Sequence, residues 1–398
     1  MNVILFDNEH RANLLPLTFT RPQADVRVGI LTIRQKWEKW LNCTTSSITQ
    51  AYLTQKYPAV VKEHNLLIAG SVCPTAELVE AIKKLNIGQI LVKNDYTIAY
   101  CVENVSLTML ESCEEKIVFD GDVTTIDYTW DIFSKNEKEL YADFHLLTQG
   151  RKSQPLSSTN TVLGRENVFV EEGAMVECAI INAKNAKVYI GKDSEIMEGS
   201  ILRGSVALCE HSQVKMGAKI YGPTTIGPHS KVGGELNNAV IFGYSNKAHD
   251  GFLGNSVLGE WCNLGADTNT SNLKNNYDIV RLWNYKTKSF VRTGLQFCGL
   301  IMGDHSKSGI NVMFNTGTVV GVSANVFGAG YQRNFFPSFH WGGGTVPIQD
   351  FKLDAAIDVA KRMYERRNLD FTDLDVQIFY SIHNLTEEFR QIDYNLIN

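Results

Sequence analysis

The sequence predicts an α/β domain followed by a parallel β-helix and C-terminal helices. The central observation is a run of aliphatic residues spaced six apart without a miss: Ile190, Ile196, Leu202, Leu208, Val214, Ile220, Ile226 and Val232. With 44% hydrophobic residues, eight hits in one phase have a chance of about 0.001. Strand and helix patterns alternate before this run, and apolar helical stripes follow it.

A six-residue period fits neither a helix nor an isolated amphipathic strand. It fits a β-helix, in which each short strand stacks about 4.8 Å from the strand one coil earlier. The repeat resumes at 252–264 and again at 302–326, where Ser308 is the one polar exception. The two departures, at about 234–250 and 270–298, predict loops on the binding face.

Residues 1–150 predict an open, mostly parallel sheet. The expected strands are Val3–Phe6, Leu66–Ala69, Gln89–Val92 and Lys116–Phe119, and the expected helix is Pro74–Leu85 with Thr75 as its cap. Ligands of such sheets bind at the carboxyl ends of strands. Polar stretches occur there after the first strand and at Asp120–Asp122.

A helical segment from Trp130 to Leu147 leads into a polar linker at 151–160. The β-helix is expected at 161–344 and a helical segment at 345–398. Within the latter, helices are predicted over Asp350–Asn368 and Thr372–Phe389. We expect them to cap the open end of the β-helix or to pack on a neighbouring subunit.

Composition narrows the function classes. A net charge of −5 gives no reason to expect nucleic acid or an anionic membrane as a partner. The apolar run at the N-terminus is too short for a signal peptide or a membrane span, which favours the cytoplasm. Eight scattered cysteines without a C-x-x-C pair predict reduced thiols rather than a metal site.

The segment from Asp7 to Arg11, followed by Leu15-Pro16-Leu17-Thr18 and Arg21-Pro22, resembles the start of the sugar-1-phosphate nucleotidyltransferases. The resemblance implies that Arg11 and Arg21 bind nucleotide phosphates. It also implies that Asp120 and Asp122 hold Mg²⁺, with Asp122 beside the nucleotide. The family's loop glycines are absent, and Gln23 stands where the family has a lysine. A shortened, degenerate nucleotidyltransferase-like domain is therefore expected.

Residues of about 215–330 resemble the acetyltransferase half of the bifunctional N-acetylglucosamine-1-phosphate uridyltransferase / glucosamine-1-phosphate acetyltransferase family. The motif that carries the likeness is Lys247-Ala248-His249, Leu253-Gly254-Asn255, Asn263-Leu264-Gly265-Ala266 and Ser271-Asn272. The resemblance implies a left-handed triangular prism, a homotrimer and acetyl-CoA as cosubstrate. The cosubstrate would run along Gly309, Ile310 and Gly328 of an adjacent subunit.

Acetyl transfer to an amine requires a base near neutral pH, and His249 matches the family's catalytic histidine. Asn272 could stabilise the oxyanion, and Glu235 could hold the amine. The other residues expected to bind substrate are Asn237, Lys247, Phe252, Asn263, Lys219, Tyr221 and Lys274. Asn237 and Phe252 stand where the family has a lysine and a tyrosine, so a lysine elsewhere could supply the lost charge.

The leading hypothesis is a CoA-dependent N-acetyltransferase acting on an amino-sugar phosphate in nucleotide-sugar synthesis. One alternative is a sugar-1-phosphate nucleotidyltransferase (uridylyl- or thymidylyltransferase) with the β-helix as trimer scaffold. The other is a non-catalytic sugar-nucleotide-binding protein. The second departure carries Trp283, Tyr285 and Phe290, which we expect to reach a neighbouring subunit because they are too apolar for a free loop.

Overall fold

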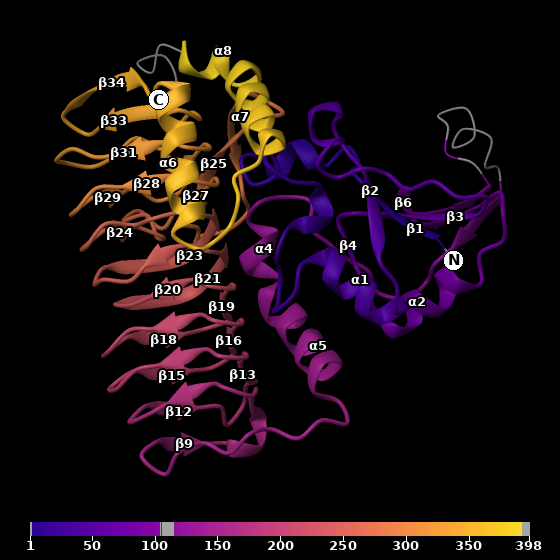
Figure 1. Ribbon diagram of the computed structural model, residues 1–398, viewed down its shortest axis with the longest axis horizontal. Helices are drawn as coiled ribbons and strands as arrows, with labels where there is room; N and C mark the ends of the chain where they lie inside the picture. The colour runs from indigo at the N-terminus through magenta and orange to yellow at the C-terminus, as the bar shows by residue number, and fades with distance from the viewer. Residues whose placement is uncertain (1, 104, 106–114, 392–398) are drawn as a thin grey trace. The chain divides into compact units, whose positions relative to one another are not determined.

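Buried strands organise both parts of the chain, for which the computed structural model describes residues 2–103, 105 and 115–391 (Figure 1). The contacts divide the chain into two units. The first comprises Met1–Leu14, Thr20–Val26 and Leu31–Tyr128, and the second comprises Leu15–Phe19, Arg27–Ile30 and Thr129–Asn398. The helical segment that follows residue 128 is thus grouped with the β-helix.

The first unit is built on a six-stranded sheet in the order β2-β1-β3-β6-β5-β7. Neighbours are parallel except around β6, which is antiparallel to β3 and β5, so the prediction of a mostly parallel sheet is confirmed. The strands are β1 (Asn2–Phe6), β2 (Thr45–Ile48), β3 (Asn65–Ala69), β5 (Gln89–Lys93), β6 (Tyr96–Val102) and β7 (Glu115–Val118). A separate pair joins β4 (Val72–Cys73) and β8 (Thr124–Thr125).

Among the described residues of this unit, two α-helices accompany the sheet. The helix α1 (Ile33–Leu41) begins with a capping box between Thr32 and Gln35, and its Trp37 is fully buried with the indole N–H on the Val72 carbonyl at 2.8 Å. The predicted helix is α2 (Ala76–Lys83), where the Thr75 hydroxyl accepts from the Leu78 amide. Short 3-10 turns lie at η1 (Arg11–Leu14), η2 (Gln23–Asp25) and η3 (Ala51–Leu53).

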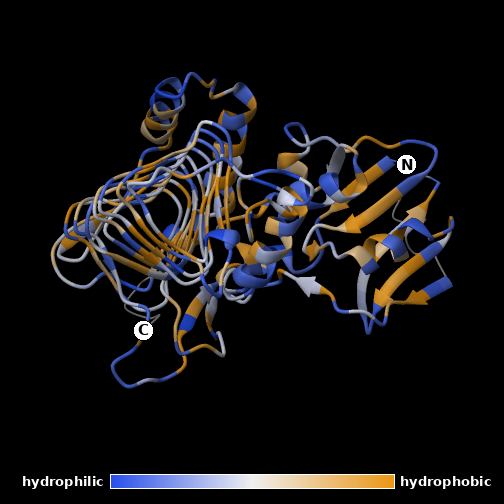
Figure 2. Ribbon diagram, turned by 90° about the horizontal axis from the view of Figure 1, so that it is seen from below, coloured by the Kyte–Doolittle hydropathy of each residue, from blue (hydrophilic) through white to orange (hydrophobic). Residues whose placement is uncertain are grey.

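The second unit contains the β-helix, and the predicted fold class is confirmed. Its coils have three faces, which Figure 2 shows stacked in projection. Face I contains β9 (Thr161–Leu163), β12 (Ile180–Asn182), β15 (Ile201–Arg203), β18 (Lys219–Tyr221), the first halves of β21 (Glu235–Gly243) and β23 (Phe252–Glu260), β24 (Asn269–Thr270) and β29 (Met313–Phe314).

The other two faces follow the same stacking. Face II contains β10 (Val168–Val170), β13 (Val188–Ile190), β16 (Val206–Leu208), β19 (Thr224–Ile226), the second halves of β21 and β23, β27 (Leu300–Met302), β30 (Thr318–Val320) and β32 (Phe335–Phe336). Face III contains β11 (Met175–Val176), β14 (Glu195–Ile196), β17 (Gln213–Val214), β20 (Lys231–Val232), β22 (Asn246–Lys247), β28 (Lys307–Ser308), β31 (Asn325–Val326) and β33 (His340–Gly343).

The six-residue repeat predicted the interior correctly. All eight aliphatics from Ile190 to Val232 belong to one buried core that runs the length of the prism. The polar exception, Ser308, also points inward, where its hydroxyl lies 2.8 Å from that of Thr268 and accepts from the Gly265 amide. A buried hydroxyl is tolerated there because it is hydrogen-bonded.

A helical segment and a short extended segment pack on face II. The helices are α4 (Asp131–Ser134) and α5 (Asn136–Thr148), in agreement with the predicted helical segment. The Asn136 amide oxygen accepts from the Gly29 N–H at 2.7 Å, and the Asn136 amide nitrogen donates to the Pro223 carbonyl at 2.8 Å. Asn136 therefore ties the residue 27–30 segment to the side of the prism.

The C-terminal helices are α6 (Leu353–Glu365), α7 (Asp373–Leu385) and α8 (Glu387–Arg390), and they follow a hairpin of β33 and β34 (Val346–Asp350). The helix α6 contacts a corner of the prism, because Tyr364 stacks on Trp261 with ring centroids 4.1 Å apart. Within the chain these helices thus pack along the later coils (Figure 1), and the expectation that they cap an open end was wrong.

The apolar hairpin of the second departure, β25 (Arg281–Asn284) with β26 (Ser289–Arg292), folds back on its own chain. Trp283 stacks on Phe335 at 4.4 Å, and Tyr285 meets Phe389 of α8 edge-on at 5.0 Å. Both side chains are buried. The expectation that they reach a neighbouring subunit was therefore wrong, since their apolar surface is already covered.

The seven cysteines within the described residues are all free thiols, whereas Cys113 lies outside those residues. In the part of the chain that the structure describes, no helix has the length and hydropathy needed to span a bilayer.

Candidate active site

Face I brings most of the predicted site residues together. In the strand register Glu235 lies between Lys219 and Phe252, and Asn237 lies between Tyr221 and Gly254. These residues alternate with buried Ile220, Leu236 and Leu253, so their side chains point outward. Three successive coils therefore present a polar surface with two aromatic rings, those of Tyr221 and Phe252. We call the set Lys219, Tyr221, Glu235, Asn237, Phe252 and Asn272 the face I cluster.

Glu235 and Tyr221 are held together within this cluster. The Tyr221 hydroxyl donates to Glu235 Oε1 at 2.6 Å. This hydrogen bond, together with partial burial, raises the pKa of Tyr221 to about 12. The phenol thus stays protonated at neutral pH and fixes the carboxylate, whose second oxygen can accept from a ligand.

Gly254 explains how Phe252 and Asn272 come close to each other. A Cβ at position 254 would lie 2.5 Å from the Phe252 ring and 2.6 Å from Asn272 Nδ2, so only glycine leaves room for both side chains. The Asn272 amide donates to Asn255 Oδ1 at 2.8 Å, which sets the plane of the amide. Its second N–H can donate to a ligand.

His249 is exposed, and it lies three residues before Phe252 at the turn that begins the next strand of face I. Backbone hydrogen bonds fix both ends of this turn: the Gly233 N–H donates to the Lys247 carbonyl at 2.8 Å and the Glu235 N–H to the Gly251 carbonyl at 3.2 Å. The imidazole is therefore carried by a well-anchored turn beside the face I cluster, with access to solvent.

Lys247 does not take the role that we expected. It is in register with the core residue Val232 and is only 2% exposed, and its ammonium donates to the His249 carbonyl at 2.6 Å. Burial lowers the pKa of Lys247 to about 8. Because the side chain points into the prism, Lys247 cannot meet a substrate on the outer surface, and that expectation was wrong. It instead supports the turn that carries His249.

Asn263 also lies apart from the cluster. Its backbone continues face III, between Asn246 and Lys307, whereas Glu235 and Phe252 are on face I. Within one chain Asn263 therefore cannot share a ligand with them. Lys274, by contrast, lies two residues after Asn272 and lines a cavity on face I.

The residues expected to hold acetyl-CoA differ in what they can offer. The Gly309 N–H donates to the Val326 carbonyl at 2.9 Å, so it is already used between coils. A Cβ at Gly328 would lie 2.3 Å from the Gly343 carbonyl oxygen, which shows that this glycine serves coil packing. Ile310 is 71% exposed and is the one of the three that offers apolar surface to a ligand.

In the first unit, the polar residues after β1 bind one another. Arg11 Nε pairs with Asp7 Oδ2 at 2.9 Å, and Arg11 also donates to the Tyr52 hydroxyl. Arg11 is 7% exposed and Arg21 5% exposed, so neither guanidinium faces solvent as a phosphate clamp would. Burial raises the pKa of Asp7, and the nearby Arg11 opposes that rise.

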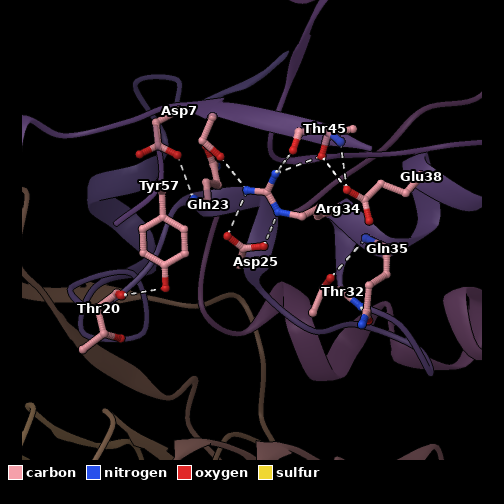
Figure 3. A network of polar contacts seen from close by, with 11 residues as sticks. Asp7, Thr20, Gln23, Asp25, Thr32, Arg34, Gln35, Glu38, Thr45 and Tyr57 are labelled. Carbon is pink, nitrogen blue, oxygen red and sulfur yellow. Dashed lines mark hydrogen bonds and ion pairs between the residues drawn. The ribbon is translucent and has the colours of Figure 1, made fainter. Parts of the chain in front are cut away.

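A second network continues this pattern (Figure 3). Arg34 donates to both oxygens of Asp25, at 2.5 and 3.0 Å, and to the Thr45 hydroxyl at 2.9 Å. These contacts join the loop after β1 to α1 and β2. The charged groups of this network bind one another and hold the loop, α1 and β2 together.

Sequence reasoning missed one polar group of the first unit. Asn8 Nδ2 donates to Ser71 at 3.0 Å and to Tyr96 at 2.8 Å, and the Tyr96 hydroxyl donates to Asp127 at 3.1 Å. His10 stacks on Tyr96 with ring centroids 5.5 Å apart. The available signal was the position of Asn8, which follows β1 at the carboxyl edge of the sheet.

Asp120 and Asp122 are exposed after β7. Within the described residues, no three His, Cys, Asp or Glu side chains come close enough to share a metal ion. Mg²⁺ is often held by one or two carboxylates plus substrate phosphates. These two aspartates therefore fit that ion only in company with a nucleotide.

Comparisons with known proteins relate the chain to nucleotide-sugar enzymes. Residues 3–152 match the family described as sugar nucleotidyl transferase. The bifunctional protein GlmU of Trichodesmium erythraeum is 31% identical over 140 residues, which are 35% of this chain and 25% of that protein. The bifunctional sugar-1-phosphate nucleotidylyltransferase/acetyltransferase of Sulfurisphaera tokodaii is 28% identical over 143 residues, 35% of each chain.

Among solved structures, the polySia-specific acetyltransferase NeuO matches 53% of this chain and 99% of its own, with 16% identity and a TM-score of 0.28, a likeness too weak to bear on function. The chain spans only about a quarter to a third of the two curated relatives. Together these sequence matches show that residues 3–152 are similar to the sugar nucleotidyl transferase family and that the chain is similar to the GlmU-type bifunctional proteins.

Proposed function

We propose that the β-helix transfers an acetyl group from acetyl-CoA to the amine of an amino-sugar phosphate in nucleotide-sugar synthesis. The observation that carries this proposal is the exposed His249 on an anchored turn that leads directly into the face I cluster. The similarity to a bifunctional sugar-1-phosphate nucleotidylyltransferase/acetyltransferase supports the same reaction class.

The chemistry assigns a role to each side chain. The amine nitrogen attacks the thioester carbonyl, a C–N bond forms, the C–S bond breaks, and CoA leaves as the thiol. His249 takes the proton that the amine loses, since imidazole is a suitable base near neutral pH. The remaining N–H of Asn272 donates to the developing oxyanion, and Glu235 accepts from the amine. Ile310 offers apolar contact to the donor.

The test is thiol release from acetyl-CoA in the presence of amino-sugar phosphates. His249→Asn should lower the rate by about 100-fold or more, because general-base catalysis contributes about 10²–10⁴-fold. His211→Asn is the matched control, since His211 is also an exposed histidine of the prism. Equal rates of thiol release for His249→Asn and the wild type would contradict the proposal.

We also propose that the chain forms a homotrimer through face I. Ile180 and Ile201 are 43% and 41% exposed and stack in register directly before Lys219, which leaves an apolar strip beside the cluster. Such strips mark interfaces. Light scattering should give the mass of three 44.5 kDa chains, and Ile201→Glu should lower it to that of one.

A second activity, nucleotidyl transfer, is favoured by the family match of residues 3–152. Asp120 and Asp122 would hold Mg²⁺ with the nucleotide phosphates, and Arg11 would have to leave Asp7 to reach a phosphate. Pyrophosphate release from a nucleoside triphosphate and a sugar-1-phosphate tests this activity. If neither thiol nor pyrophosphate is released, a non-catalytic sugar-nucleotide-binding protein would be favoured.

A further inference from the structure

Face I carries a cavity of about 390 Å³ beyond the face I cluster. Its floor comes from three successive coils, on which Asn269, Met313 and Tyr331 are in register. One wall is the start of the second departure, at 273–275. Ser271 and Leu273, which line it, flank Asn272. The cavity therefore borders the segment that carries the proposed catalytic asparagine.

The amide groups of the cavity are oriented by the coils. Asn315 Nδ2 donates to the Gln332 carbonyl and Asn334 Nδ2 to the Thr316 carbonyl, both at 2.6 Å. Because each nitrogen is bound to backbone, each amide keeps its oxygen as an acceptor for another group. Two such acceptors among the lining residues favour a ligand that carries hydroxyl donors.

The charge of the cavity selects among such ligands. Among the described residues that line it, Lys274 is the only charged one, so none of them is acidic. Lys274 Nζ makes a long contact of 3.4 Å with the Ile279 carbonyl, which leaves the ammonium N–H groups available to a stronger acceptor. Tyr331, which is 71% exposed, also lines the cavity and offers an aromatic ring to a ligand. An anionic sugar fits this combination, whereas a cation does not.

The size of the cavity narrows the ligand further. A volume of 390 Å³ lies at the lower end of the range of about 300–1,000 Å³ for small-molecule sites. It suits a monosaccharide with one charged substituent better than a whole nucleotide sugar.

We propose that this cavity binds the sugar ring and phosphate of the acceptor. Lys274 contacts the phosphate, and Asn315 and Asn334 accept hydrogen bonds from ring hydroxyls. The inference rests on the proposed function, because it assigns the acceptor's sugar to a site next to Asn272. Lys274 would also provide the positive charge that is missing at Asn237, where the resembling family has a lysine.

Calorimetric titration without acetyl-CoA tests the cavity directly, with a hexosamine phosphate, the same hexosamine without phosphate, and inorganic phosphate as probes. Lys274→Gln should weaken binding of the sugar phosphate by about tenfold or more, since a hydrogen bond to a charged group contributes about 1.5–3 kcal/mol. The neutral hexosamine should bind this variant as it binds the wild type. Asn334→Ala should weaken the binding of both the hexosamine phosphate and the neutral hexosamine.

Two controls separate this inference from the acyl-transfer proposal. Lys192→Gln removes an exposed lysine of an early coil and should leave all titrations unchanged. His249→Asn should bind the sugar phosphate like the wild type, so binding is measured apart from turnover. The inference is overturned if Lys274→Gln and Asn334→Ala bind the sugar phosphate within twofold of the wild type, or if the wild type does not bind it at millimolar concentration.

Discussion

The loop after β1 and face I of the β-helix carry similar residue types in opposite states. In the first, Asp7 and Arg11 form a 2.9 Å ion pair with both side chains buried. In the second, Lys219 and His249 are exposed, and Glu235 is bonded only through a neutral phenol. Charged residues of a motif that resembles a known family can therefore serve the fold in one region and be exposed to ligands in another, depending on their partners.

The difference follows from where the two regions obtain their order. The loop after β1 has few regular hydrogen bonds of its own, so contacts such as those of Arg34 and Asp7 fix its course. Face I is ordered by its coils, whose backbone groups bond one another. Its outward side chains are therefore left for ligands. Substitutions in the first region should affect stability, and those in the second should affect turnover.

The largest effect should come from Arg11→Met. Removing Arg11 leaves the buried Asp7 carboxylate without its cationic partner, which costs about 3–5 kcal/mol of unfolding free energy. His249→Asn should change that free energy by less than about 0.5 kcal/mol, as surface substitutions do. Urea unfolding of both variants measures this contrast. A stable Arg11→Met protein would show that the loop does not depend on the pair.

Lys247→Met should reveal a pH-dependent difference in stability. The pKa of Lys247 is lowered to about 8 in the fold from an ordinary value of 10.5, so the unfolded chain binds more protons between these values. The buried ammonium thus destabilises the wild type below pH 8, and this penalty is relieved as the pH rises toward 10.5. In that window the unfolding free energy of the wild type should rise relative to that of Lys247→Met, by up to about 1.4 kcal/mol per pH unit.

Urea unfolding of both proteins at pH 7, 8, 9 and 10 measures this difference, and other titrating groups cancel in the subtraction. A difference that stays flat over the window would mean that Lys247 is not buried as a charge. At pH 7 the same variant should also slow thiol release, because the hydrogen bond to the His249 carbonyl is lost. Thiol release by Lys247→Arg should exceed that of Lys247→Met if donation to this carbonyl positions the turn.

Much of the fold and part of the candidate site could be predicted from the sequence, and the predictions that failed did so for physical reasons. The interior aliphatics were found because each coil repeats one chemical requirement at a fixed spacing. Lys247 was misassigned because the coil from Val232 to Lys247 is three residues shorter than the preceding coil, which turns a motif lysine inward. Asn315 and Asn334 were missed because only the stacking of distant coils brings them beside Lys274.

Gly254→Ala should have an effect of about tenfold on turnover with little loss of stability. A Cβ there would collide with the Phe252 ring and the Asn272 amide, and both can swing outward from the surface. Displacing them by about 1 Å disturbs the orientation on which the reaction depends. The measurement is kcat/KM for thiol release. A variant with unchanged kcat/KM would mean that neither side chain contributes to the site in this position.

The smallest effect should come from Ser308→Val, which restores the aliphatic repeat. Valine fills an interior position that the pattern reserves for an apolar residue, but it removes the 2.8 Å contact with the Thr268 hydroxyl. That hydroxyl also lies 3.1 Å from the Gly309 carbonyl, which can still accept its proton. The Gly265 amide also keeps an acceptor, the Ser308 carbonyl at 3.2 Å, so no donor is left unsatisfied and the unfolding free energy should change by less than about 1 kcal/mol. Urea unfolding measures it, and a loss well above 2 kcal/mol would mean that the Thr268–Ser308 contact holds these coils together.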